Sequence, residues 1–167
     1  MTSDLRIDEF IMKEFFLYLL YFSETNGGEF EAGGEVVYLN ILDRLVLEGE
    51  GDVWETDLKK GLPSISEEAK RAILNGKLPS LMKIKIQSGE DEFVFTLDSK
   101  TPDLKSLKIP VVAVKETDIK IEQRLFYIET VYFILESLFK QFYRLRTNEG
   151  EWENFVKDVK KWAKNLS

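Results

Sequence analysis

Residues 10–22 read FIMKEFFLYLLYF, and Lys13 and Glu14 are the only charged residues among them. Residues 15–22 form an unbroken run of apolar and aromatic side chains. A run of this length does not span a bilayer, which takes about 20 apolar residues. The residues that follow, 23–28, lack the small-residue cleavage site of a secretory signal. We therefore expect a helix that is buried in a core or an interface, with no role in a membrane.

Local signals mark both ends of this helix. Ser3 or Asp4 can cap its first turn, because a short polar side chain accepts hydrogen bonds from the free backbone N–H groups there. Asn26, Gly27 and Gly28 follow its last turn and readily adopt the left-handed conformation in which helices end. The sequence thus predicts an N-terminal helical region over residues 1–28.

Residues 29–115 are predicted to form a small antiparallel β-rich region with one short helix. Residues 35–48 are rich in Val, Ile, Leu and Tyr, which favours one or two strands with a break at Asp43 and Arg44. Residues 82–86 alternate apolar and charged side chains, and residues 93–97 are again apolar after a polar turn. This pattern predicts a β-hairpin.

Three further segments complete this region. Ser64 with Glu67 three residues later has the spacing of a capping box, so residues 66–75 are predicted to form a short helix that Gly76 ends. Residues 98–108 are polar, contain Pro102 and are predicted to form a linker. Residues 109–114, IPVVAV, are predicted to form a short apolar strand.

The last third, residues 116–167, is predicted to form a helical hairpin. In its first helix, from Asp118 to Leu145, apolar residues at alternating spacings of four and three form one stripe, which we assign to the core of the chain itself: Ile121, Leu125, Ile128, Tyr132, Leu135, Phe139 and Phe142. Other large apolar residues lie beside or behind this stripe: Phe126, Phe133, Ile134, Leu138 and Tyr143. A helix that is apolar around most of its circumference must be covered on more than one side, so we assign this second set to a contact with another chain.

Asn148, with Glu151 at the capping-box position, is predicted to begin the final helix. Trp152 and Trp162 fall on its apolar face. Because the whole face is apolar, we interpret both as core or interface residues rather than as a ligand site.

The composition removes most familiar enzyme designs. The chain has no cysteine and no histidine, so it lacks thiolate nucleophiles, the commonest general base and the commonest transition-metal ligand. The absence of cysteine gives no reason to place it in an oxidising compartment, and we expect a cytoplasmic protein. No phosphate-binding glycine loop occurs, and we expect neither a cofactor nor a metal.

The charge is unevenly distributed. Residues 24–57 contain ten acidic side chains and Arg44 as their one basic side chain, a local charge of −9 in a chain of net charge −7. Such a segment repels phosphate groups, so we expect no direct nucleic-acid binding by this acidic region.

One acidic constellation superficially matches a nuclease pattern. Asp103 after Pro102, followed by Asp118 and Lys120, has the order of a motif in which two acids hold Mg²⁺. That motif places the second acid on a strand, whereas Asp118 falls where it would cap the next helix. A metal-dependent hydrolase that uses Asp103 and Asp118 therefore remains an alternative only.

Part of the chain resembles GINS subunits. Residues 57–63, DLKKGLP, and the apolar positions up to Gly76 resemble the small β-rich domain of that family, in which a strand and a glycine-containing loop lead into one short helix. Residues 126–129, FYIE, and residues 155–162, FVKDVKKW, are similar to segments of its helical domain. The aromatic helix that precedes the small domain and the hairpin at residues 82–97 depart from the family pattern.

The resemblance implies a non-catalytic subunit of a helical heterotetramer that supports the replicative helicase during DNA replication. Its subunit contacts would come from the aromatic face over residues 125–142.

Taken together, the sequence predicts an α+β protein that binds other proteins, or copies of itself, through its C-terminal helices. A homodimeric adaptor or chaperone is the other non-enzymatic hypothesis. The residues expected at the protein interface are Phe126, Phe133, Ile134, Leu138, Tyr143, Trp152 and Trp162.

Overall fold

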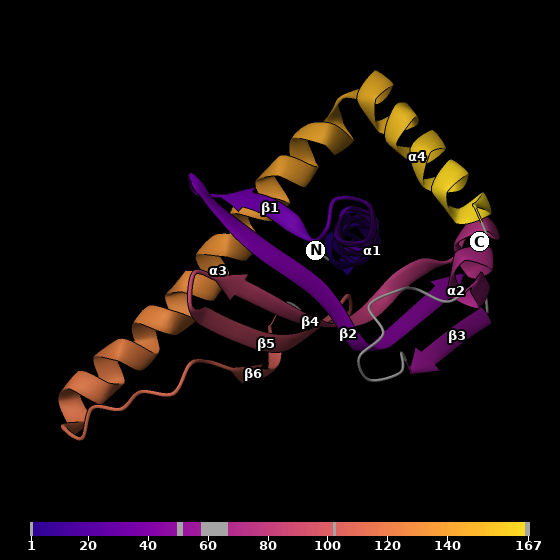
Figure 1. Ribbon diagram of the computed structural model, residues 1–167. Coiled ribbons are helices and arrows are strands. Elements are labelled where there is room, and N and C mark those ends of the chain that lie inside the picture. The colour runs from indigo at the N-terminus through magenta and orange to yellow at the C-terminus, as the bar shows by residue number, and fades with distance from the viewer. Residues whose placement is uncertain (1, 50–51, 58–66, 102, 166–167) are drawn as a thin grey trace.

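The computed structural model describes residues 2–49, 52–57, 67–101 and 103–165 of the 167-residue chain. In this part of the chain, four helices and six strands form the α+β fold that the sequence predicts. An N-terminal helix precedes an antiparallel sheet, and a helical hairpin follows it (Figure 1). One hydrophobic core contains residues from all three regions.

Helix α1 (Thr2–Thr25) lies at the centre of this core. Figure 1 shows it almost end-on, between the sheet and the two C-terminal helices, α3 (Thr117–Thr147) and α4 (Glu149–Lys164). Phe16, Leu19 and Leu20 are completely buried, which confirms the expected core helix. Every helix in the described residues is too short or too polar to cross a membrane.

The end of α1 follows from the local sequence. Helix α1 stops at Thr25, and Gly27 and Gly28 then take φ values of 63° and 78°, as the sequence predicts. Gly28 has a second reason to be glycine, since a Cβ atom there would lie 2.6 Å from the backbone oxygen of Leu39. The turn thereby brings the chain directly from α1 into the sheet.

The sheet is organised around one long strand, β2 (Glu35–Gly49). Strands β1 (Glu29–Ala32) and β3 (Asp52–Asp57) pair with the two ends of β2 on the same side. Strand β4 (Leu78–Ser88) pairs with β2 on its other side, followed outward by β5 (Asp91–Asp98) and β6 (Lys105–Lys108). All these pairings are antiparallel, and β4 and β5 are the predicted hairpin.

Strand β2 is continuous through Asp43 and Arg44. The sequence alone did not decide whether this segment forms one strand or two. The register with β4 shifts between Ile41 and Leu45, so the residues between them bulge out of the pairing. A bulge absorbs the two polar residues without ending the strand.

One face of the sheet packs against α1. Its side chains alternate with outward ones along each strand, as expected for a sheet with one covered face. The fully buried members on the central strands are Leu39, Leu45, Leu47, Met82, Ile84, Ile86, Phe93 and Phe95.

Helix α2 (Glu67–Leu74) is the short helix that was expected. At its end the backbone N–H of Gly76 donates to Ile73 and that of Lys77 donates to Ala72, which is a Schellman motif. Gly76 has a φ of 87° and ends the helix as predicted. The predicted cap, Ser64, lies outside the described residues.

The structure corrects two predictions next to the sheet edge. Strand β6 lies within the predicted linker, residues 98–108, and pairs with β5 at Val94 and Thr96. The predicted strand at residues 109–114 is not paired with the sheet and runs from β6 to the start of α3. Strand formation depends on an available neighbour, and the register places the lysine-rich segment rather than the apolar one beside β5.

Charged groups connect α1 to the C-terminal helical hairpin. Glu14 on α1 is 7% exposed, and its carboxylate accepts a hydrogen bond of 2.9 Å from Nε of Arg146 near the end of α3. The guanidinium of Arg146 also lies 5.0 Å from the ring centre of Trp152 on α4. The Arg146 side chain on α3 therefore contacts both α1 and α4.

Replacing Arg146 by Met should lower the free energy of unfolding by about 3 kcal/mol, because it leaves the buried Glu14 carboxylate without its cation. Urea unfolding measures this change. The matched control is Lys83→Met, which breaks the ion pair between two more exposed side chains, Lys83 and Asp43, 3.4 Å apart. This substitution should lower the free energy of unfolding by no more than about 0.5 kcal/mol. Equal effects of the two substitutions would contradict this account.

Strand β6 is attached to β5 partly through Asp98. The Asp98 carboxylate accepts hydrogen bonds from Lys105 Nζ at 2.8 Å and from the backbone N–H of Lys100 at 3.0 Å. Burial raises the pKa of Asp98, but the hydrogen bonds and charges of these two lysines outweigh it, so the pKa lies below its ordinary value.

Because the folded-state pKa of Asp98 is lowered, its stabilising effect is complete above the unfolded pKa of about 3.9 and is lost as the pH falls further. We therefore expect Asp98→Asn to be less stable than the wild type at pH 7, with the difference shrinking below about pH 4. Thermal unfolding of both proteins between pH 3 and pH 7 measures this. A difference that stays constant over that range would count against the ionised contact.

Candidate functional site

Helix α3 presents a different face to the core from the one that its heptad stripe indicates. The buried residues of α3 are Val131, Ile134, Leu138 and Phe142. Of the predicted core stripe, only Phe142 is fully buried, and Ile121, Leu125 and Tyr132 are 52%, 53% and 43% exposed. The prediction that this stripe belongs to the core of the chain itself is therefore wrong over its first half.

The cause is the composition of α3. Apolar residues occupy so much of its circumference that periodicity defines several faces of similar hydrophobicity. The position of α1 and of the β1–β2 hairpin selects among them. At the end of α3 the original stripe does reach the core, where the rings of Phe139 and Phe15 pack edge to face with centroids 5.2 Å apart.

Six large apolar side chains of α3 remain between 43% and 63% exposed. We refer to them as the exposed apolar face, and they are Ile121, Leu125, Phe126, Tyr132, Phe133 and Tyr143. They occupy the side of α3 that is turned away from α1. Exposed charged residues such as Glu122 and Glu129 lie among them on the same side of the helix.

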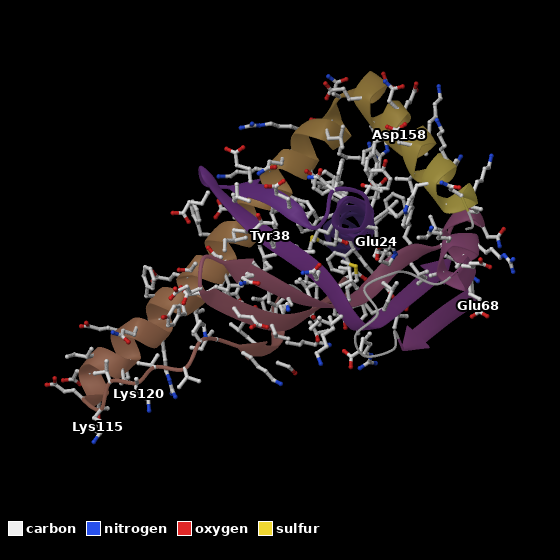
Figure 2. All side chains as sticks on the ribbon, viewed as in Figure 1. Glu24, Tyr38, Glu68, Lys115, Lys120 and Asp158 are labelled. Atoms are coloured by element: carbon white, nitrogen blue, oxygen red, sulfur yellow. The ribbon has the colours of Figure 1, made fainter. Side chains whose placement is uncertain are left out.

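The first half of α3 extends beyond the edge of the sheet (Figure 1). Figure 2 shows Lys115 and Lys120 at this projecting end, far from the body of the molecule. The preceding segment, residues 109–116, leads back from there to β6, and its Val111 is 94% exposed. Val111 is thus a further exposed apolar side chain outside α3.

Charged residues follow a line along the outside of α3. Asp118, Glu122, Glu129 and Glu136 are all exposed and recur every four or seven residues, so they share one side of the helix. Lys140 and Arg144 continue the same line toward the end of the helix, and Lys140 Nζ lies 3.1 Å from Glu136 Oε1. We call these six residues the charged row; it runs from acidic to basic along α3. Asp118 lies within the first turn and is not the predicted cap, because Glu116 occupies that position.

The edge of β1 lies against α3. The backbone N–H of Gly33 donates to Ser137 Oγ at 3.3 Å, and the Gln141 side-chain amide donates to the backbone oxygen of Glu31. Residues here also border a hollow of about 350 Å³, which Lys140 and Arg144 line. These contacts fix the angle at which α3 leaves the body.

The structure separates the seven residues expected at an interface into two groups. Phe126, Phe133 and Tyr143 belong to the exposed apolar face. Ile134 and Leu138 are 4% and 0% exposed and lie in the core, so they cannot contact another chain.

The two tryptophans of α4 are half-buried at the edge of the core. Trp152 stacks on Phe155 with ring centroids 5.0 Å apart. Trp162 packs edge to face on Tyr21 at 5.6 Å, and Lys70 Nζ lies 5.2 Å from its ring centre. Their main contacts are within the chain. Asn148 caps α4 as predicted, because its side chain accepts from the backbone N–H of Glu151.

Sequence reasoning missed Ile121, Leu125 and Tyr132 as surface residues. Their heptad spacing was recognised but was assigned to the internal core. The charged row does not distinguish them, because charged residues on the side opposite the core face are usual on a surface helix.

The acids of the alternative hydrolase lie on different elements. Asp103 precedes β6, and Asp118 begins α3 beyond the unpaired segment, residues 109–116. Within the described residues, no group of three or more acidic, histidine or cysteine side chains is placed to hold a metal ion. This arrangement offers no specific support for metal-dependent hydrolysis.

Comparison of the chain with protein-family models, with curated proteins and with solved structures gives no match.

The contact between α3 and the β1–β2 turn gives a quantitative prediction. Gly33 has a φ of 60°, and a Cβ atom there would overlap the ring of Phe133. Gly33→Ala should therefore lower the free energy of unfolding by about 2 kcal/mol, of which about half comes from backbone strain. In a Phe133→Ala background, the same substitution should cost only about 1 kcal/mol. A double-mutant cycle in urea measures the coupling, and additive effects would show that the ring does not rest on Gly33.

Proposed function

We propose that this protein is a non-catalytic interaction subunit or scaffold that binds another protein chain through the exposed apolar face of α3. The observation that carries the proposal is the exposure of six large apolar side chains on one helix, each between 43% and 63%. These side chains face away from a core that is already complete, because Val131, Leu138 and Phe142 on the opposite side are fully buried. Phe133 also packs against Gly33 and Tyr143 stacks on Phe139, but about half of each of these two side chains stays exposed.

Burial of apolar surface supplies the driving force for such a contact, at about 25 cal/mol for each Å² removed from water. Aromatic side chains are enriched at the centres of protein interfaces, since they bury a large area with few rotatable bonds. Phe126, Tyr132, Phe133 and Tyr143 match that composition.

The resemblance to GINS subunits suggests one context for this activity. We propose a subunit that supports a replicative helicase, in which α3 provides subunit contacts. The support is the order of elements, with β-rich residues before a C-terminal helical hairpin, and the aromatic side chains at residues 126 and 127. Residues 58–63, which carry much of the resemblance, lie outside the described residues. A cytoplasmic location and the absence of nucleic-acid contacts by the acidic segment, residues 24–57, belong to the same proposal.

The proposal predicts that association and folding depend on opposite faces of α3. A triple variant, Ile121→Ser, Leu125→Ser and Phe126→Ser, should keep the circular dichroism and melting temperature of the wild type, because these side chains are more than half exposed. It should lose association with other chains, whether identical or different. The control Leu138→Ser removes a fully buried side chain and should destabilise the fold by about 3 kcal/mol or more.

Light scattering after size exclusion measures self-association, and quantitative cross-linking in the native cell measures contacts with other proteins. A wild type that is monomeric and has the same cross-linked neighbours as the triple variant would refute the proposal.

A further inference from the structure

We propose that a hollow on the outer face of the sheet binds a small soluble ligand through its phosphate groups. The outer face is the side that is turned away from α1, and the hollow has a volume of about 390 Å³, which is in the range of small-molecule sites. Its polar lining comes from four strands and consists of Asp43, Arg44, Lys83, Thr96, Ser106 and Lys108. These residues lie outside the exposed apolar face, so the inference goes beyond the proposed function and does not depend on it.

The lining is basic although the protein is acidic. Three cations, Arg44, Lys83 and Lys108, border the hollow with one acid, Asp43. The local charge is therefore +2 in a chain of net charge −7. Guanidinium and ammonium groups donate several hydrogen bonds each, and they bind phosphate oxygens through charge-assisted contacts. The hollow thus has the composition of an anion site.

A bulge in β2 brings charged residues together beside Lys83. Ile41 pairs with Ile84 and Leu45 pairs with Met82, so the three residues between them on β2 lie opposite Lys83 alone. A regular pairing would place a single β2 residue there. Two of the three extra side chains are the Asp43 and Arg44 that line the hollow.

A second irregularity, in β6, turns a lysine toward the same hollow. Val94 pairs with Lys108, and the neighbouring pair lies two residues further along β5 but three residues back along β6. Without the extra residue, Leu107 instead of Lys108 would lie beside Val94 on the outer face. Ser106 at this bulge has a φ of 53°, an uncommon conformation for a residue other than glycine. The irregularity lets Leu107 pack against the core while Lys108 faces the hollow.

Two of the cations can bind a ligand without breaking a strong contact. In the part of the chain that the structure describes, Lys108 forms no ion pair. Lys83 Nζ lies 3.4 Å from Asp43 Oδ1, but 36% and 48% of the two side chains is exposed, so water weakens this contact. A phosphate group carries up to two negative charges and attracts a lysine more strongly than one carboxylate does.

The surrounding charge favours a small ligand over a long polyanion. Strand β2 belongs to the acidic segment, residues 24–57, which has a local charge of −9. A nucleic acid or an anionic membrane would extend over this segment and be repelled by it, whereas a short ligand stays within the hollow. Side chains, and not the backbone N–H groups of a glycine-rich loop, would hold the phosphate groups. The sequence therefore contains no glycine-loop motif for this site.

A nuclear magnetic resonance titration of the isotope-labelled full chain with inorganic pyrophosphate, at low and constant ionic strength, tests the site. We expect saturable shifts of the amide signals of Arg44, Thr96 and Ser106, with a dissociation constant below about 1 mM. Vesicles that contain a phosphorylated inositol lipid should not bind the protein. Binding to those vesicles would assign the phosphate to a membrane and overturn the proposal of a soluble ligand.

Three lysine variants test which cations hold the ligand. Lys83→Gln and Lys108→Gln should each raise the dissociation constant at least about fivefold, because each removes one charge-assisted contact. The matched control is Lys85→Gln, which removes a lysine two residues along β4, outside the hollow, and should change the constant by less than about twofold. Circular dichroism of each variant should match the wild type, since each side chain is at least partly exposed.

Asp43→Asn tests the sign of the ligand charge. The substitution removes the carboxylate that competes for Lys83 and keeps the size of the side chain, so pyrophosphate should bind about threefold more tightly. Weaker binding by Asp43→Asn would overturn the proposal, because it would indicate that the carboxylate holds a cation. Equal losses in Lys85→Gln and Lys108→Gln would show general attraction to surface lysines and would also overturn it. So would the absence of saturable shifts up to about 10 mM pyrophosphate.

Discussion

The fold depends on the need to cover α1 on every side. Phe15–Leu20 are six consecutive buried residues, and a helix with no polar side in that stretch cannot lie on the surface. The sheet covers one side of α1, while α3 and α4 diverge around the other sides (Figure 1). The side of α3 that serves this purpose is fixed by contact with Phe15 and Tyr18, whose rings lie 5.5 Å and 5.7 Å from that of Phe142. The six residues of the exposed apolar face are left on the outside as a consequence.

The same constraint explains which features were predictable from the sequence. Boundaries set by local chemistry were identified, such as the end of α1 at Gly27 and Gly28, the end of α2 at Gly76 and the start of α4 at Asn148. Each depends on a few neighbouring residues whose backbone preferences and side-chain hydrogen bonds do not change with the surroundings. Features that depend on distant partners were not identified. Residues 105–108 pair with β5 although residues 109–114 have the stronger strand composition, because register and not propensity decides which segment pairs.

The core-facing side of α3 belongs to the second class. Its heptad stripe and its true core face, Val131, Ile134, Leu138 and Phe142, lie roughly a quarter-turn apart on a helix of 3.6 residues per turn. Both are apolar, and only the distant residues of α1 distinguish them. The heptad spacing alone therefore does not identify the core face of α3.

The central position of α1 also affects how the protein is made. The sheet that covers one side of α1 is synthesised next, but Phe142 and Phe155, which close the other side, come about 125 and about 140 residues later than Phe16 in the chain. At typical rates of about 5–20 residues per second, the ribosome exposes the aromatic run for several seconds or more before those residues emerge. Nascent chains in that state bind readily to holdase chaperones and to one another. The helix that organises the finished core is thus the segment whose biosynthesis demands the most protection from aggregation.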